Sequence, residues 1–232
     1  MKTCPTRLHT EPSTIEQTWD VDGVPVLTAS LSVPCPTQAA DAVSRRIRRF
    51  YQLQSRSYLH YCEHWLLPQA KAEYAASLAV SAPLRCFHAE LTYCVTYNDG
   101  GFWSLYTQSR EPLPSGQTLL TRRGDTWDLT AGYPVPLGSF FPRNTRWKRR
   151  LLAQATEEIE RQLRSGAAVY YPFWRKELRR SFNSRSSYLT GDGLAFFYPM
   201  QSLSPSTELP VFVLPYHELR LFPNITPSSA DT

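Results

Sequence analysis

The sequence has no hydrophobic run long enough to cross a membrane as a helix. Its uncharged apolar stretches are all well short of the roughly 18 residues that such a helix needs. Residues 1–30 also lack a basic start followed by an apolar run of about 7 to 15 residues, the mark of a secretory signal. We therefore expect no membrane span and, by default, a cytoplasmic location. An extracytoplasmic location stays open if the natural start lies further upstream.

Paired cysteines are missing as well. The five cysteines lie 31, 27, 24 and 8 residues apart, so they form neither a CxxC metal motif nor an even set for disulfides. We expect reduced and mostly buried thiols. Glycine is also scarce, with 10 residues against 19 prolines, which indicates stiff, extended connections.

The composition is that of a globular protein with a substantial core. Hydrophobic residues make up 42% of the 232 residues and aromatic residues 13%, which excludes a disordered, collagen-like or coiled-coil chain. The net charge of +5 is ordinary for a soluble protein of this size. We expect one globular unit over residues 19–222, with subdomains at 19–115 and 116–222. A flexible tail (1–18) and a disordered tail (223–232) should flank it.

The N-terminal half combines a helical pattern with a strand pattern. Apolar residues recur at spacings of three and four over 36–79, which predicts a long helix. Pro68 should kink this helix or split it in two, because proline removes a backbone donor and clashes with the preceding turn. Period-two alternation over 87–97 predicts a strand. The turn at 98–101 predicts an antiparallel return over 102–107.

The C-terminal half begins with more strands and a second helix. Strands are expected at 117–122 and 126–130, joined by a turn at Arg123-Gly124-Asp125. Asn144 or Thr145 should cap the second helix, which should stop before Ser165-Gly166. One stripe of this helix carries its apolar residues, which are Leu151, Leu152, Ala155, Ile159 and Leu163.

The remaining residues predict a short helix and a closing set of strands. The helix is expected at 173–182, a tight hairpin at 188–194, and strands at 195–198 and 211–214. The predicted fold class is α+β, with a single antiparallel meander sheet. The long N-terminal helix and the second amphipathic helix should pack on that sheet.

Two stretches of the C-terminal third carry a family resemblance. Tyr188–Thr190 is followed by Gly193–Pro199, and Val211–Leu219 forms a closing strand and turn. These stretches resemble the domain of unknown function 3298 (DUF3298) family. The N-terminal half, with Val33-Pro34 and the strand ending at Tyr97-Asn98, is similar to its usual companion, the domain of unknown function 4163. This pair forms the extracytoplasmic part of the RsiV anti-sigma factor and precedes the catalytic domain of the bacterial deacetylase PdaC.

The resemblance implies a fold and a domain type rather than an activity. The activities of RsiV and PdaC belong to other segments of those proteins. Residues 109–116 also depart from the glycine-glycine-alanine-histidine stretch that family members commonly carry. RsiV-like domains bind lysozyme, which is strongly basic, and a chain with a charge of +5 is poorly matched to that partner.

A possible metal motif lies within the long predicted helix. His60-Tyr61-Cys62-Glu63-His64 matches H-x-x-E-H, in which two histidines one helical turn apart bind zinc and the glutamate is a base. A distant glutamate would have to complete the site, and the candidates are Glu157, Glu158 and Glu160. The alternative interpretation is a pair of histidines beside the core stripe of Tyr61 and Trp65, with no metal.

Cationic residues are concentrated in three runs. The densest contains Arg45, Arg46, Arg48 and Arg49, and the others lie at 146–150 and 175–180. A surface that follows nucleic-acid phosphates needs several such runs on one face and aromatic side chains free to stack. Here the nearby aromatics lie on core stripes, so solvated helix faces are favoured over nucleic-acid binding. The densest run is the candidate surface for an anion or a partner.

No motif for covalent catalysis or nucleotide binding is present in the sequence. It has no G-x-S-x-G elbow, no Walker loop and no G-x-G-x-x-G stretch. We therefore expect a non-enzymatic, cofactor-free RsiV-like domain that binds a protein or an anionic envelope polymer. The two alternatives are a small zinc-dependent hydrolase built on His60, Glu63 and His64, and a cytoplasmic nucleic-acid-associated protein.

Overall fold

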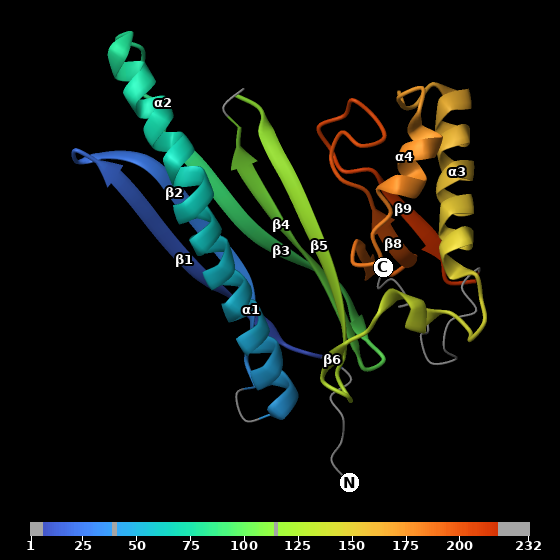
Figure 1. The fold of residues 1–232 in the computed structure, drawn as a ribbon. Helices are drawn as coiled ribbons and strands as arrows, with labels where there is room; N and C mark the ends of the chain where they lie inside the picture. Colours follow the sequence, from blue (N-terminus) through green and yellow to red (C-terminus); the bar gives the residue numbers. More distant parts are fainter. Residues whose placement is uncertain (1–6, 39–40, 114–115, 218–232) are drawn as a thin grey trace. The chain divides into compact units, whose positions relative to one another are not determined.

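A computed structural model describes residues 7–38, 41–113 and 116–217 (Figure 1). Backbone contacts divide the chain into two compact units. The N-terminal unit consists of His9–Tyr93 and Thr107–Leu119. The C-terminal unit consists of the described parts of Met1–Leu8, Cys94–Tyr106 and Leu120–Thr232. This division follows contacts rather than chain order, so it does not coincide with the boundary expected between residues 115 and 116.

The N-terminal unit begins with a long antiparallel hairpin. Its strands are β1 (Thr10–Val21) and β2 (Val24–Pro36), joined by a turn in which Asp22 and Gly23 have φ values of 53° and 77°. The expectation of a flexible tail over residues 1–18 is therefore wrong for 10–18, while residues 1–6 lie outside the described part. Most side chains of β1 are exposed at the edge of the sheet, so its sequence is as polar as that of a tail.

The second strand of the hairpin continues into a parallel pair. β2 pairs with β3 (Phe87–Asp99) in parallel, from Leu27 opposite Phe87 to Leu31 opposite Leu91. A parallel pair needs a long crossover connection, and the helical segment between the two strands supplies it. The expectation of a purely antiparallel sheet is therefore wrong at this pair.

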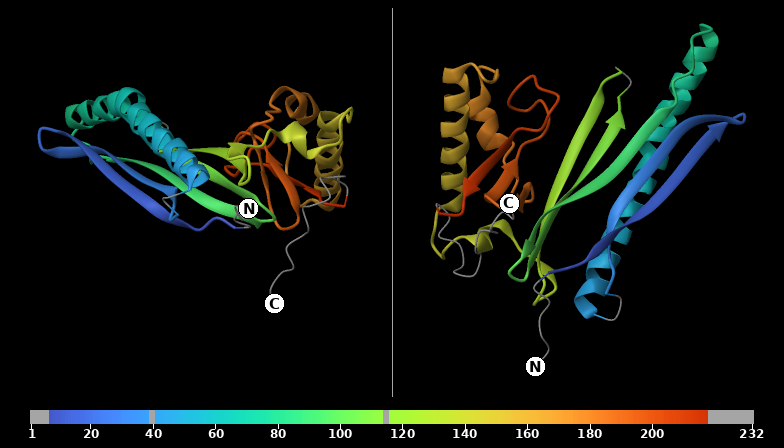
Figure 2. Two further views of the ribbon diagram at one scale, coloured as in Figure 1. Left: turned by 90° about the horizontal axis from the view of Figure 1, so that it is seen from below. Right: turned by 180° about the vertical axis from the view of Figure 1, so that it is seen from behind.

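The crossover is a long helix that packs along β2 in the N-terminal unit (Figures 1 and 2). It runs as α1 (Ala42–Tyr61), a π-helical turn (Cys62–Leu66) and α2 (Leu67–Ala79). The Asp41 carboxylate caps α1 by accepting a hydrogen bond from the Ser44 amide at 2.9 Å. Pro68 lies in the first turn of α2, directly after the π-helical turn, and the backbone stays helical from Ala42 to Ala79, so the proline does not break the helix in two. None of the described helices is both long and apolar enough to cross a membrane.

The sheet continues with β4 (Phe102–Pro112), β5 (Thr118–Asp128) and β6 (Tyr133–Pro134), giving the order β1-β2-β3-β4-β5-β6. The turn expected at Arg123-Gly124-Asp125 is wrong, because β5 is continuous there. Gly124 is buried, and a side chain on it would place its Cβ 2.1 Å from the Ser187 carbonyl oxygen. The glycine therefore serves close approach between two segments rather than chain reversal.

A second sheet is present in the C-terminal unit, so the expectation of a single sheet is also wrong. Its antiparallel strands are β7 (Ser187–Leu189), β8 (Gly193–Phe197) and β9 (Val211–Pro215). The hairpin expected from Tyr188 to Tyr198 is confirmed by β7 and β8. The Leu189 amide donates to the Ser104 hydroxyl at 2.8 Å, which ties β7 to β4.

Two helices cover the core of the C-terminal unit. After a 3-10 turn (Leu137–Phe140), the chain forms α3 (Trp147–Ser165) and α4 (Trp174–Arg180). Gly166 ends α3 in the left-handed conformation with a φ of 67°, so the helix includes Ser165 and ends one residue later than expected. The start of α3 differs from the expectation, because its N-cap residue is Arg146 and makes no side-chain cap. The buried stripe of α3 packs into an aromatic core that includes Phe196, Tyr198 and Phe212. The tail expected at 223–232 lies outside the described residues.

Candidate functional site

The residues of the H-x-x-E-H motif lie on the exposed side of the junction between α1 and the π-helical turn. His60, Glu63 and His64 are all exposed, and each has a potential ligand atom within 4.8 Å of the others. The two imidazole rings lie 3.8 Å apart between centroids. Glu158 and Glu160, expected as further ligands, accept hydrogen bonds from Arg161 and Arg175 instead. The motif is thus assembled as a surface cluster of three residues.

The opposite side of the same turn faces a buried carboxylate. Glu111 of β4 accepts hydrogen bonds from Tyr61 and Ser109, both at 2.9 Å, and is only 6% exposed. Cys62 is fully buried beside this group. Glu111 was not among the candidate residues, because its burial depends on a helix about 50 residues earlier in the chain.

This arrangement raises the pKa values of three groups on the helix. Burial is the largest cause for Tyr58, Tyr61 and Cys62, and the negative charge of Glu111 raises all three further. The pKa of Tyr61 rises to about 12. The pKa of Cys62 also rises to about 12, from 9.0. All three groups therefore stay protonated at physiological pH and act as hydrogen-bond donors or core side chains.

We expect Cys62 to resist alkylation in the folded protein. Its raised pKa leaves roughly a thousandfold less thiolate at pH 8 than an ordinary thiol has, whereas Cys94 is exposed. Iodoacetamide at pH 8 followed by peptide mass spectrometry should show rapid labelling of Cys94 and labelling of Cys62 only in denaturant. Equal labelling of both in the native protein would contradict the burial of Cys62.

The same shift predicts how stability depends on pH. Above pH 9 the unfolded chain loses the Cys62 proton before the folded chain does, so the unfolded state binds fewer protons. The contribution of this group to the free energy of unfolding should therefore fall as pH rises from 9 toward 12. Denaturant titrations of Cys62→Ala across this interval should show a shallower fall than those of the wild type.

The arginine run at the start of α1 does not behave as one surface. Arg45, Arg46 and Arg49 are exposed, whereas Arg48 is half-buried and donates to the Pro36 carbonyl at 2.6 Å. Arg48 thus holds the end of β2 and serves the fold. The remaining three residues keep their candidate role as an anion-binding or partner surface.

A cavity of about 430 Å³ in the C-terminal unit gathers more polar groups. It is lined by β5, by the segment around the 3-10 turn and by the loop before β7. Two arginines line it, Arg123 and Arg185, together with Asp125 and the hydroxyl-bearing Ser184 and Ser187. Its apolar wall consists of Pro134, Val135, Pro136, Leu137 and Phe140.

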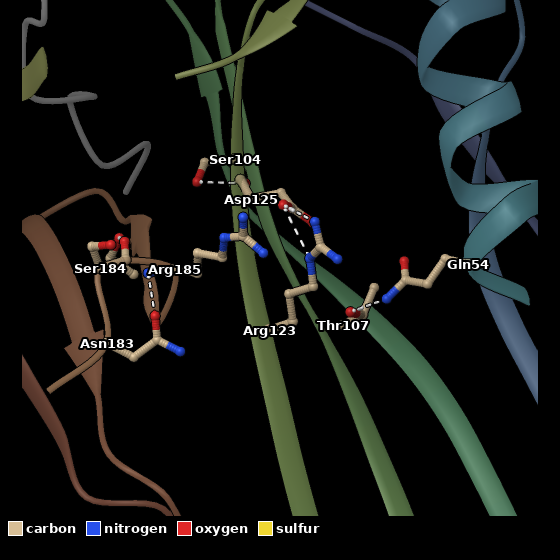
Figure 3. Close-up of polar contacts among 9 residues, drawn as sticks. Gln54, Ser104, Thr107, Arg123, Asp125, Asn183, Ser184 and Arg185 are labelled. Atoms are coloured by element: carbon tan, nitrogen blue, oxygen red, sulfur yellow. Dashed lines mark hydrogen bonds and ion pairs between the residues drawn. The ribbon is translucent and has the colours of Figure 1, made fainter. Parts of the chain in front are cut away.

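The charges in this cavity are arranged unequally. Arg123 donates to the Asp125 carboxylate through Nε at 3.3 Å and Nη2 at 3.2 Å, as Figure 3 shows. Asp125 is only 8% exposed, so its buried carboxylate fixes the position of the Arg123 guanidinium. Arg185 is exposed, and its backbone amide donates to Asn183 Oδ1 at 2.9 Å, which shapes the loop that carries it. The cavity lining therefore carries two arginine charges and one carboxylate, which leaves one positive charge in excess.

A larger hollow of about 680 Å³ in the same unit has a different lining. Most of its wall is apolar or neutral, and its one charged lining residue among those described is Glu208. Ligand sites are recognised by convergent polar groups on an apolar wall rather than by volume alone. The smaller cavity is therefore the better candidate site.

Solved structures provide the comparison for this arrangement of elements. A DUF3298 family member from Bacteroides fragilis matches with a TM-score of 0.66 at 13% identity, covering 94% of this chain and 96% of that one. A DUF3298 family protein from Pseudomonas aeruginosa matches with a TM-score of 0.60 at 16% identity, covering 96% and 98%. The chain has the fold of DUF3298 proteins. No protein-family model and no curated protein matches its sequence.

The DUF3298 fold explains why the sequence did not indicate this cavity. Arg123 and Asp125 were interpreted as turn residues, and Arg185 was not singled out. These residues lie about 60 positions apart and share a cavity only because β5 passes the loop before β7. The sequence offered only the alternation of Arg123 and Asp125 on one strand, which places both side chains on the same face of β5.

Proposed function

We propose that this chain is a divergent, RsiV-like DUF3298 domain that binds a partner without catalysing a reaction. The cavity at Arg123, Asp125 and Arg185 takes an anionic group of that partner, either a carboxylate or a phosphate. The observation that carries this proposal is the excess of one arginine charge in a cavity with an apolar wall.

The chemistry of the lining supports binding rather than proton transfer. Arginine stays protonated throughout the physiological pH range and offers planar donors that match carboxylate and phosphate oxygens. Asp125 already accepts from Arg123, so this pair positions the arginine and leaves Arg185 to meet the incoming anion. Ser184 and Ser187 add donors beside it.

The apolar wall restricts what can be attached to the anionic group. Leu137 and Phe140 are almost fully buried, at 4% and 2% exposure, and thus provide a rigid surface. A short apolar or sugar-like moiety next to the charge would pack there and lose contact with water. Acidic segments of proteins and anionic envelope polymers share this chemistry.

Arg185→Gln should weaken anion binding by about 10- to 100-fold, because a hydrogen bond to a charged group contributes roughly 1.5–3 kcal/mol. The probes are a labelled glutamate-rich decapeptide and a glycerol-phosphate oligomer, measured by fluorescence anisotropy at low salt. The peptide represents a protein partner and the oligomer an envelope polymer. Neutral dextran of similar size should not bind.

Arg179→Gln is the matched control. Arg179 is an exposed arginine of α4 outside the cavity lining, so its loss changes the net charge equally. Binding of either probe that depends on Arg185 but not on Arg179 would support the proposal. Equal weakening by both substitutions would indicate unspecific surface charge and overturn it, as would the absence of binding to both probes at millimolar concentration.

A further inference from the structure

We propose that His60, Glu63 and His64 form a surface site for a divalent transition-metal ion such as Zn²⁺. The site belongs to the N-terminal unit and is independent of the anion-binding cavity. Two imidazoles and one carboxylate are donors that zinc accepts in proteins. Nothing in this inference requires hydrolysis.

The spacing of the donors fits one ion. Their potential ligand atoms all lie within 4.8 Å of one another. Donors around tetrahedral zinc lie about 3.3 Å apart, given bonds of about 2.0–2.1 Å. All three side chains are exposed, so small rotations about their side-chain bonds can close this difference without moving the core.

A second observation concerns the protonation of His64. Its Nδ1 lies 2.9 Å from the carbonyl oxygen of His60. A carbonyl oxygen only accepts, so Nδ1 must carry the proton, and the lone pair of the neutral ring is then on Nε2. Metal-binding histidines in proteins use this arrangement, in which one ring nitrogen donates to a carbonyl and the other binds the ion.

The π-helical turn contributes to the alignment. The Leu67 amide donates to the Cys62 carbonyl, five residues back, which widens the turn that contains Glu63 and His64. The rings of His60 and His64 lie 3.8 Å apart between centroids and are tilted by 38°. On the opposite side, Tyr61 is held by Glu111 and Cys62 is buried, so the backbone beneath the three donors is anchored.

Three protein donors leave one tetrahedral position for water or for a donor from another molecule. The exposed position of the cluster on the helix gives such a donor access. The structure thus assigns an open, three-donor metal site rather than a closed structural one.

Zinc uptake tests the proposal directly. Untagged protein carrying Cys94→Ser, which removes an exposed thiol, is stripped of metal and titrated with ZnCl₂ by calorimetry, with equilibrium dialysis as a check. One equivalent should bind. His60→Gln and His64→Gln should each lower the affinity at least tenfold, since even the loss of an outer-shell partner costs about 10- to 100-fold. Glu63→Gln should lower it less.

His88→Gln is the matched control. His88 is another exposed histidine of the N-terminal unit, and its Nδ1 lies 2.7 Å from the Thr28 hydroxyl. Its substitution should leave zinc affinity unchanged. The proposal is overturned if the Cys94→Ser protein shows no saturable uptake at 100-fold excess zinc, or if the affinity survives in both the His60 and the His64 variant of it. Circular dichroism should show the same helix content in every variant, because the replaced side chains are all exposed.

Discussion

Replacing Gly124 by alanine should lower the free energy of unfolding by about 3 kcal/mol or more. The new Cβ would lie 2.1 Å from the carbonyl oxygen and 2.7 Å from the carbonyl carbon of Ser187. Both are backbone atoms, so no side chain can rotate away and the two strands must separate. Forcing an extra carbon into a packed core costs typically 1–3 kcal/mol, and a clash between backbones lies at or beyond the upper end. Urea denaturation monitored by tryptophan fluorescence would measure the change.

Gly191→Ala provides the control for this effect. Gly191 lies in the loop between β7 and β8, a Cβ there would meet nothing within 4 Å, and its backbone conformation is not left-handed. We expect the free energy of unfolding of Gly191→Ala to stay within about 0.5 kcal/mol of the wild-type value, as for most surface changes. If Gly124→Ala is equally mild, β5 and β7 do not approach each other as described.

Leu151→Ala should cost about 2–5 kcal/mol of stability. Leu151 is fully buried on α3, in the core that contains Phe196 and Phe212. Truncation removes buried methyl groups and leaves a cavity that the surrounding helices and sheet fill only in part. Thermal and chemical unfolding should both show the loss.

Leu163→Ala makes the same chemical change on the same helix. Leu163 is 42% exposed, so less burial is lost and no closed cavity forms. Both substitutions have the same effect on helix propensity, and only the packing differs. We expect a cost below about 1 kcal/mol for Leu163→Ala. Equal losses for the two would mean that Leu151 does not lie in a closed core.

The sequence placed both leucines on one apolar stripe, and the structure separates them. Periodicity shows which side of a helix is apolar, but it does not show how far along the helix the partner surface extends. Leu163 lies in the last turn of α3, just before Gly166 ends the helix. The adjacent Gln162 accepts a hydrogen bond from the Tyr170 hydroxyl at 2.7 Å.

Local pattern was also insufficient where segments from distant parts of the chain meet. The polar sequence of β1 resembles a tail because the strand lies at an edge and needs few apolar residues. Gly124 resembles a turn residue because the same lack of a side chain serves turns and close approaches alike. For Gly124 the deciding neighbour, Ser187, lies about 60 residues further along the chain and is absent from the local window.

The two candidate sites also differ in whether local sequence could reveal them. The cluster of His60, Glu63 and His64 was visible in the sequence, since helical spacing alone brings residues 60 and 64 to one face. The cavity was not, because Arg123 and Arg185 belong to elements whose contact depends on the packing of β5 and β7.

The amino-acid sequence alone determined the α+β class, the long helical segment before Phe87, the strand from Phe87 and the hairpin from Tyr188 to Tyr198. These features depend on propensity, periodicity and turn chemistry, which act over a few residues. Only the tertiary structure decided the parallel pairing of β2 with β3, the presence of two sheets and the burial of Glu111. It also decided the cavity that Arg123 and Arg185 line together. Each of these depends on which distant segments become neighbours. The observed pairing is the one that gives the whole packed core its lowest free energy.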